Sequence, residues 1–180
     1  LIVLTSPVML ITAIAIKAYD KGDVFFRQER LTKDGKVFRI YKFRSMIMNA
    51  EKNTGAILAR EGDSRITPVG KFIRKCRIDE LPQLFNILKG DMTFVGPRPE
   101  RPVLFDEIVK EVPEFKYRLT VKAGLTGYAQ IYGKYNTTMR DKLLLDIYYI
   151  ENYSLITDIK LIIMTLKVIF IPESTEGVKE

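Results

Sequence analysis

Histidine is absent from this chain of 180 residues, and cysteine occurs once, as Cys76. Without histidine, neither a Ser-His-Asp nor a Cys-His catalytic arrangement can form, and most zinc sites are excluded. Acid–base chemistry must therefore rely on carboxylates, lysine, tyrosine or a hard metal ion. The lone cysteine excludes an intrachain disulfide framework and fits a reducing compartment.

Acidic residues are outnumbered, with 22 Asp and Glu against 29 Lys and Arg, which gives a net charge of +7. Such an excess indicates an anionic partner: nucleic acid, anionic lipid or a phosphorylated small molecule. The length suits one domain with a real core, and the sequence contains no internal repeat.

Charge is missing altogether from the first sixteen residues, Leu1 to Ile16. A membrane span needs about 20 residues, and a chain that starts at Leu1 rather than Met is expected to be a piece of a longer protein. Pro7 removes a backbone hydrogen bond, and the Ser6 hydroxyl can satisfy the carbonyl that Pro7 leaves free. The segment predicts a membrane-inserted helix kinked at Ser6-Pro7, spanning or re-entrant, with a buried core helix as the alternative.

The remaining segments predict an α/β fold that is mostly helical. Two short strands joined at Asp34-Gly35 are indicated by alternating apolar and polar residues. Asp79 is expected to cap a helix that starts at Pro82. The C-terminal helix is either a core helix or an interfacial one, with Lys160 and Lys167 reaching the lipid headgroups. The expected strands are Val24–Arg30 and Val37–Arg44; the expected helices are Met46–Leu58, Val69–Cys76, Pro82–Leu88, Val103–Leu119 with a break at Pro113, and Lys142–Ile171.

Two adjacent carboxylates, Asp79 and Glu80, directly follow a basic run, and a rigid Gly-Pro-Arg-Pro turn lies further along. Cations around an acid can bind an anionic substrate and keep the carboxylate ionised as a nucleophile or metal ligand. The bland alternative is a surface ion pair worth under about 1 kcal/mol. The candidate phosphate- and nucleotide-binding residues are Lys42, Arg44, Arg74, Arg77, Arg98 and Arg101.

Nine blocks, in order along nearly the whole chain, resemble the bacterial sugar transferases, the monotopic phosphoglycosyl transferases that load a sugar phosphate onto polyprenyl phosphate. A single block would be weak evidence, but nine in register make chance similarity implausible. The blocks are Ser6-Pro7, Phe25–Gln28, Tyr41–Met46, Thr67–Arg74, Asp79–Leu84, Asn86–Met92, Val95–Pro99, Leu125–Gly127 with Gln130, and Tyr149–Ser154.

The resemblance implies a re-entrant membrane helix on the cytoplasmic leaflet, surface amphipathic helices and a small α/β catalytic part. It also implies that Asp79 attacks the β-phosphate of a nucleoside diphosphate sugar, usually a UDP-sugar. A phosphosugar-aspartyl intermediate would form, and polyprenyl phosphate would then take the phosphosugar. Glu80 would assist proton transfer or orient the acceptor, and Mg²⁺, with Asp79 as a ligand, would bridge the carboxylates and the diphosphate.

The resulting prediction is an enzyme that initiates surface glycan synthesis at the cytoplasmic face of a bacterial inner membrane. It comprises a membrane helix over residues 1–18, a catalytic domain over 19–172 and a polar tail over 173–180. The alternative is a basic module that binds membrane or nucleic acid, with a structural Asp-Glu pair. Arginines gathered around two carboxylates disfavour a nucleic-acid partner. The oligomeric state is left open, a homodimer included, and no motif identifies the sugar.

Overall fold

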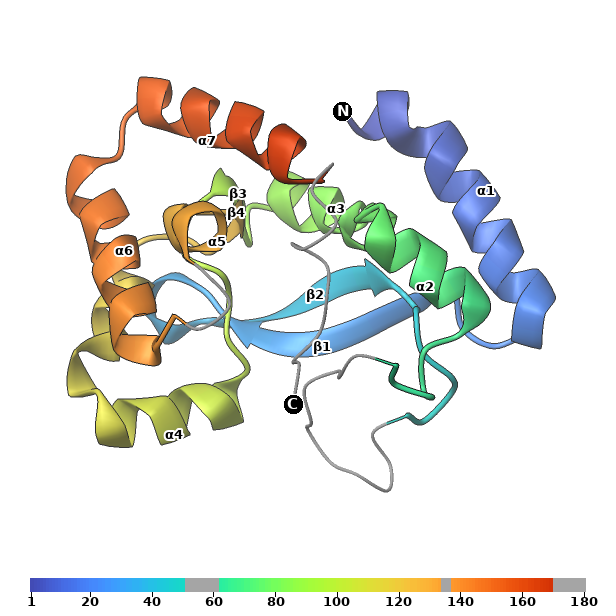
Figure 1. Cartoon of the computed structure of the whole chain (residues 1–180), viewed down its shortest axis with the longest axis horizontal. Helices are drawn as coiled ribbons and strands as arrows, with labels where there is room; N and C mark the ends of the chain where they lie inside the picture. Colours follow the sequence, from blue (N-terminus) through green and yellow to red (C-terminus); the bar gives the residue numbers. More distant parts are fainter. Residues whose placement is uncertain (51–61, 134–136, 170–180) are drawn as a thin grey trace. The chain divides into compact units, whose positions relative to one another are not determined.

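A computed structural model describes residues 1–50, 62–133 and 137–169 (Figure 1). The described part is mostly helical with two small strand pairs, which confirms the predicted fold class in outline. In chain order the elements are α1 (Ile2–Asp20), β1 (Phe25–Leu31), η1 (Lys33–Gly35), β2 (Val37–Phe43), α2 (Pro68–Lys75), η2 (Ile78–Glu80), α3 (Gln83–Leu88), β3 (Thr93–Val95), α4 (Pro102–Glu111), η3 (Pro113–Thr120), β4 (Gly124–Thr126), α5 (Tyr128–Tyr132), α6 (Met139–Asn152) and α7 (Leu155–Ile169), where η denotes a 3₁₀ helix.

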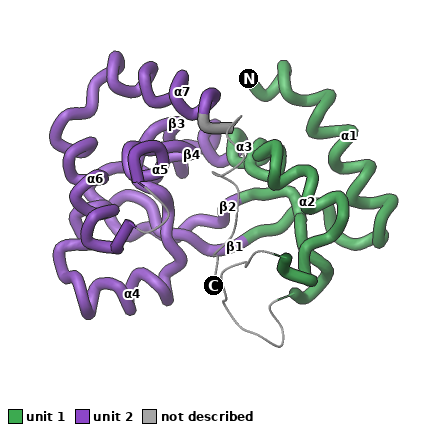
Figure 2. Tube along the Cα trace, viewed as in Figure 1, with its two compact units in different colours: residues 1–27, 41–84, 169–180 green, residues 28–40, 85–168 purple. Residues whose placement is uncertain are grey.

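The chain divides into two compact units (Figure 2). The first contains residues 1–27, 41–84 and 169–180, and the second contains residues 28–40 and 85–168. The predicted membrane segment 1–18 falls in the first unit and stays a prediction as a separate domain. The predicted polar tail 173–180 lies outside the described residues.

In the first unit, α1 is a single helix that leaves most of its apolar side chains exposed. Its buried residues are Met9, Thr12 and Ile16, which share one face. It is the one helix in the described part of the chain that is long and apolar enough to cross a membrane. The Ser6 Oγ donates to the Val3 carbonyl at 2.8 Å, the carbonyl four residues before Pro7. The predicted satisfaction of this carbonyl is confirmed, while a re-entrant kink stays a prediction.

The predicted hairpin is confirmed, with β1 and β2 forming a two-stranded sheet. Asp34 and Gly35 adopt φ of 58° and 73°, the left-handed conformation that Asp and Gly accept most readily. The Thr32 amide donates to Lys36 O at 2.9 Å and closes the turn. The helix expected at Met46–Leu58 is wrong at its start, where Met46 pairs with Ile66 in an isolated bridge; residues 51–61 lie outside the described part.

The second unit holds a parallel pair, β3 and β4, that sequence reasoning missed. Thr93 is in register with Gly124, and Val95 with Thr126. Each strand has three residues, too few for an alternating pattern to emerge in the sequence. The described part also contains three apolar clusters, one with Phe105, Phe115 and Leu143, one with Phe38 and Met92, and one in which Val95 of β3 packs with Tyr149 and Leu161.

The expected helix Lys142–Ile171 is two helices, α6 and α7, separated at Tyr153 and Ser154. α6 ends at Asn152 with Tyr153 as its C-cap. Ser154 caps the start of α7, because its Oγ accepts from the Thr157 amide at 3.2 Å. α7 buries Leu161 but exposes much of its apolar surface, so it is not an enclosed core helix. Its exposed bulky residues are Leu155, Ile156, Ile159, Ile162, Ile163 and Leu166.

Candidate active site

The Asp79–Glu80 pair lies on η2, a single 3₁₀ turn directly after α2 in the first unit. α2 starts at a well-made cap: Thr67 Oγ1 accepts from the Gly70 amide at 2.9 Å, and Pro68 occupies the first turn. Arg77 reverses the chain between α2 and η2 with φ 55°, an uncommon conformation for a residue with a Cβ. The expected capping of a helix at Pro82 by Asp79 is wrong, because Asp79 belongs to the preceding turn.

Asp79 is partly buried, and its Oδ1 is buried without a hydrogen-bond partner among the described residues. Burial and the neighbouring Glu80 raise the pKa of Asp79 to about 6, against the lowering influence of Lys42, Arg74 and Arg77. The cations thus act in the expected direction, toward the ionised form, but desolvation outweighs them in the net shift of the pKa. With this pKa, about nine tenths of the carboxylate is still ionised at pH 7.

Glu80 has a direct cationic partner on β2. Lys42 Nζ lies 2.7 Å from Glu80 Oε1, and the two side chains are 19% and 13% exposed. This ion pair connects the strand to the turn that carries Asp79. Of the predicted phosphate-binding residues, Lys42, Arg74 and Arg77 all act electrostatically on Asp79.

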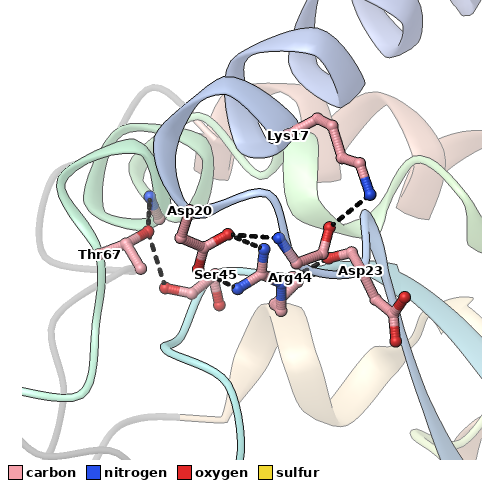
Figure 3. A network of polar contacts seen from close by, with 8 residues as sticks. Lys17, Asp20, Asp23, Arg44, Ser45 and Thr67 are labelled. Carbon is pink, nitrogen blue, oxygen red and sulfur yellow. Dashed lines mark hydrogen bonds and ion pairs between the residues drawn. The ribbon is translucent and has the colours of Figure 1, made fainter.

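Arg44 is paired within the first unit, and its predicted contact with substrate phosphate stays a prediction. Its guanidinium is buried and makes a bidentate ion pair with Asp20, the last residue of α1, while its Nε donates to the Asp23 carbonyl (Figure 3). Lys17 Nζ donates to Gly22 O at 3.3 Å in the same network. Arg44 is therefore committed to holding the end of α1. The sequence concealed this because Asp20 lies 24 residues away in an unremarkable Asp-Lys-Gly-Asp stretch.

Arg98 and Arg101 belong to the second unit, whereas Asp79 belongs to the first. Arg98 is exposed between two buried prolines, and Arg101 precedes α4 as its N-cap residue. Their predicted contacts with substrate phosphate stay predictions. Sequence reasoning also missed a buried pair in this unit, Arg118 with Asp146, although a carboxylate in the apolar run Leu143–Tyr149 is a visible signal.

The described residues contain no group of three or more His, Cys, Asp or Glu side chains placed to hold a metal ion. Mg²⁺ needs no such cage, since it is commonly held by one or two carboxylates together with substrate phosphates. The unpartnered Oδ1 of Asp79 has the chemistry of a magnesium ligand. The donor set therefore fits Mg²⁺ as a partner of a bound diphosphate.

Comparison with known proteins identifies the family. The model of the family described as bacterial sugar transferase matches residues 1–172. This chain belongs to the bacterial sugar transferase family. The matched range includes the Ser6-Pro7 pair, the Asp79–Glu80 turn and the Arg98 segment, and the family resemblance of the chain is confirmed.

Several curated relatives of this sugar transferase are named for their reactions. The chain is 48% identical over 169 residues to the UDP-N-acetylgalactosamine-undecaprenyl-phosphate N-acetylgalactosaminephosphotransferase of Aeromonas hydrophila, covering 92% of this chain and 40% of the relative. It is 40% identical to the UDP-glucose:undecaprenyl-phosphate glucose-1-phosphate transferase of Klebsiella pneumoniae, covering 97% and 38%. It is 36% identical to the undecaprenyl-phosphate galactose phosphotransferase of Salmonella typhimurium, covering 94% and 38%. The chain thus spans about two fifths of the length of these relatives.

Proposed function

We propose that this chain transfers a sugar-1-phosphate from a nucleoside diphosphate sugar, a UDP-sugar in the first instance, to polyprenyl phosphate. Family membership and the names of the relatives support this reaction class. The observation that carries the proposal is the partly buried Asp79 carboxylate, one oxygen of which has no hydrogen-bond partner among the described residues. Carboxylates that serve structure alone are normally paired when buried.

The reaction proposed for Asp79 has two displacements at phosphorus. First, a carboxylate oxygen of Asp79 attacks the β-phosphorus of the nucleotide sugar, and the bond from that phosphorus to the bridging oxygen breaks. The nucleoside monophosphate leaves with the bonding electrons, and the sugar phosphate stays on Asp79 as an acyl phosphate. Second, a phosphate oxygen of polyprenyl phosphate attacks the same phosphorus and restores the carboxylate. No net redox change or external proton donor is needed.

The cations near Asp79 make this approach of two anions feasible. Lys42, Arg74 and Arg77 act on Asp79 through their charge, and the same charge offsets the repulsion between a carboxylate and a diphosphate. The 2.7 Å ion pair with Lys42 orients Glu80 beside the nucleophile, where Glu80 can take up or return a proton of the acceptor phosphate. Mg²⁺, held by Asp79 and the diphosphate, would supply further neutralisation of charge when bound.

We further propose that the reaction takes place at the cytoplasmic face of the bacterial inner membrane, with α1 in the lipid. The acceptor proposed here is a lipid phosphate, so the site must lie close to the headgroups. Five bulky residues of α1, Val3, Leu4, Leu10, Ile11 and Ile14, are 60–85% exposed, which suits lipid better than water. The exposed apolar residues of α7, flanked by exposed Lys160 and Lys167, suit a helix lying in the interface.

The experiment is to incubate purified protein with a UDP-sugar, Mg²⁺ and polyprenyl phosphate, and to measure UMP release. A panel of UDP-glucose, UDP-galactose and UDP-N-acetylgalactosamine is appropriate because the relatives are named for these three sugars. Asp79→Asn should abolish turnover and Asp34→Asn, an exposed turn position that Asn accepts equally well, should not. Full turnover by Asp79→Asn would exclude the covalent mechanism.

The competing function is a basic binding module in which the acid pair is structural. It predicts no UMP release from any nucleotide sugar, and equal binding of vesicles or nucleic acid by wild type and Asp79→Asn. The raised pKa of Asp79 argues against it, because a purely structural carboxylate gains from pairing and typically has a lowered pKa.

A further inference from the structure

The backbone of the segment Gly96–Glu100 in the second unit is fixed by hydrogen bonds from other parts of that unit. Four consecutive carbonyl groups, from Pro97 to Glu100, each accept a hydrogen bond from elsewhere in the unit. Pro97 and Pro99 are buried, and the Arg98 side chain between them is exposed. The four bonds are Gly124 N to Pro97 O (3.0 Å), Arg118 Nη2 to Arg98 O (2.9 Å), Arg30 Nη1 to Pro99 O (3.1 Å) and Leu31 N to Glu100 O (2.9 Å).

The backbone next to this segment is packed too closely to let it shift. A Cβ added to Gly124 would lie 2.1 Å from the Gly96 nitrogen, and one added to Gly127 would lie 2.2 Å from the Gly96 oxygen. The hollow lined by Pro97, Arg98 and Arg118 has a volume of about 10 Å³, room for roughly one water molecule. The loop is thus held in one position while its central arginine reaches solvent.

Arg118 is the charged side chain that donates a hydrogen bond to the main-chain carbonyl of Arg98. Its Nε donates to Asp146 Oδ2 at 2.6 Å, its Nη1 lies 3.7 Å from Glu100 Oε1, and its guanidinium carbon lies 4.4 Å from the centre of the Phe115 ring. Arg118 and Asp146 are only 7% and 1% exposed. A buried ion pair contributes little net stability relative to apolar residues of similar size, so stability does not explain its presence here.

We propose that Arg118, held by Asp146, is a positioning residue that fixes Arg98 to receive the phosphate groups of the nucleotide sugar. The inference rests on the proposed function and on the prediction from the sequence that Arg98 binds substrate phosphate. A guanidinium grips phosphate oxygens through two parallel hydrogen bonds, which requires its backbone to be set in advance. Arg118 supplies this by bonding the carbonyl of Arg98 itself, and Asp146 keeps the Arg118 fork at the required angle.

The test is a double-mutant cycle on KM for the UDP-sugar and on kcat, using Arg118→Lys, Arg98→Ala and the double variant. Lysine keeps the charge beside Asp146 but lacks the fork that reaches both Asp146 and the Arg98 carbonyl. Arg118→Lys should raise KM about tenfold, as expected for loss of a charge-assisted bond, with kcat changed less than about twofold. In the Arg98→Ala background the same change should leave KM within about twofold.

Arg140→Lys is the matched control, because Arg140 is exposed on α6, the helix that carries Asp146, and KM should not change. Arg30→Lys is a second test that leaves the buried ion pair intact; it removes the bond to Pro99 O and should raise KM in the wild-type background only. Equal effects of Arg118→Lys or Arg30→Lys with and without Arg98 would overturn the positioning role. A wild-type protein that turns over no UDP-sugar would instead overturn the proposed function.

Discussion

Asp79 combines burial with ionisation in a way that suits a nucleophile. A carboxylate in water is a weak nucleophile because it is stabilised by hydration, and partial burial removes some of that stabilisation. Lys42, Arg74 and Arg77 limit the effect, so that the pKa rises to about 6 and not further. The group is then more basic than an ordinary aspartate but still ionised at neutral pH.

The pH dependence of the reaction should report this pKa. Because attack requires the ionised carboxylate, kcat/KM should fall about tenfold per pH unit as the pH drops below about 6, the pKa of Asp79. The measurement is UMP release between pH 4.5 and 8 at saturating polyprenyl phosphate. A rate that stays constant down to pH 5 would contradict the assignment of Asp79 as the ionised attacking group.

Asp79→Asn should make the protein more stable at pH 7 while removing its activity. The folded-state pKa of about 6 lies above the ordinary value of 3.8, so the folded state binds more protons between these values. The free energy of unfolding therefore falls as the pH rises through this window. The destabilisation caused by ionising the buried Asp79 carboxylate reaches its full size above pH 6. Removing it should stabilise the protein by about 1–3 kcal/mol, or roughly 2–4 °C in Tm per kcal/mol. Thermal unfolding of both proteins at pH 4 and pH 7 checks this, since the difference should vanish at pH 4.

At the scale of single elements, the hydrogen bond between Ser6 and Val3 in α1 can be tested by mutation. The Ser6 hydroxyl bonds the Val3 carbonyl, whose usual helical donor is replaced by Pro7. In lipid, Ser6→Ala should leave this carbonyl without a donor and cost about 1 kcal/mol. In a Pro7→Ala background, where the amide is restored, Ser6→Ala should be nearly neutral. Unfolding in lipid nanodiscs measures both; equal losses in the two backgrounds would show that the hydroxyl does not serve that carbonyl.

The start of α2 depends on close contact with the chain that follows β2. A Cβ on Gly70 would lie 1.9 Å from the Ser45 oxygen, a backbone atom that cannot rotate away. Thr67 N also donates to Ser45 O at 3.1 Å, so the two segments are bonded where they touch. Gly70→Ala should cost about 2 kcal/mol or more and lower kcat, because α2 leads directly into the turn with Asp79. Lys71→Ala, at the exposed neighbouring position, serves as the control in denaturant unfolding and UMP release.

For the molecule as a whole, the fold was predictable where a signal is local. The Asp34-Gly35 turn and the break at Pro113 each depend on one or two residues with strong backbone preferences. The β3–β4 pair was not predictable, because it joins three-residue strands about 30 residues apart. The boundary between α6 and α7 was missed although Ser154 followed by Thr157 is a usable capping signal.

The candidate site was predictable in identity but not in energetics. The family blocks single out Asp79 and Glu80, and the structure brings Lys42, Arg74 and Arg77 into their electrostatic surroundings. Burial depends on residues distant in sequence, so the direction of the Asp79 pKa shift could not be read from neighbouring charges. The pairing of Arg44 with Asp20 was not predictable for the same reason, since only the fold brings these two residues together.

The ion pair of Arg44 with Asp20 predicts a large loss of stability on breaking one partner. Asp20→Asn leaves a buried guanidinium without its counter-charge, which should cost about 3 kcal/mol. Asp23→Asn is the matched comparison, because it keeps the main-chain bond to Arg44 and removes only a weaker charge interaction, so its loss of stability should be smaller. Denaturant unfolding in detergent separates the two variants; equal stabilities would show that the pair contributes nothing.

Lys42 on β2 and Arg44 just after it each make an ion pair with a residue that is distant in the sequence. One binds the acid beside the nucleophile, and the other binds the last residue of α1. On the proposal that α1 lies in the bilayer, the spacing of these two side chains on β2 would set the height of Asp79 relative to the lipid headgroups. A lipid phosphate is confined to that one layer of the membrane, so an acceptor whose phosphate is carried on a water-soluble spacer should be a poor substrate, whatever its sugar donor.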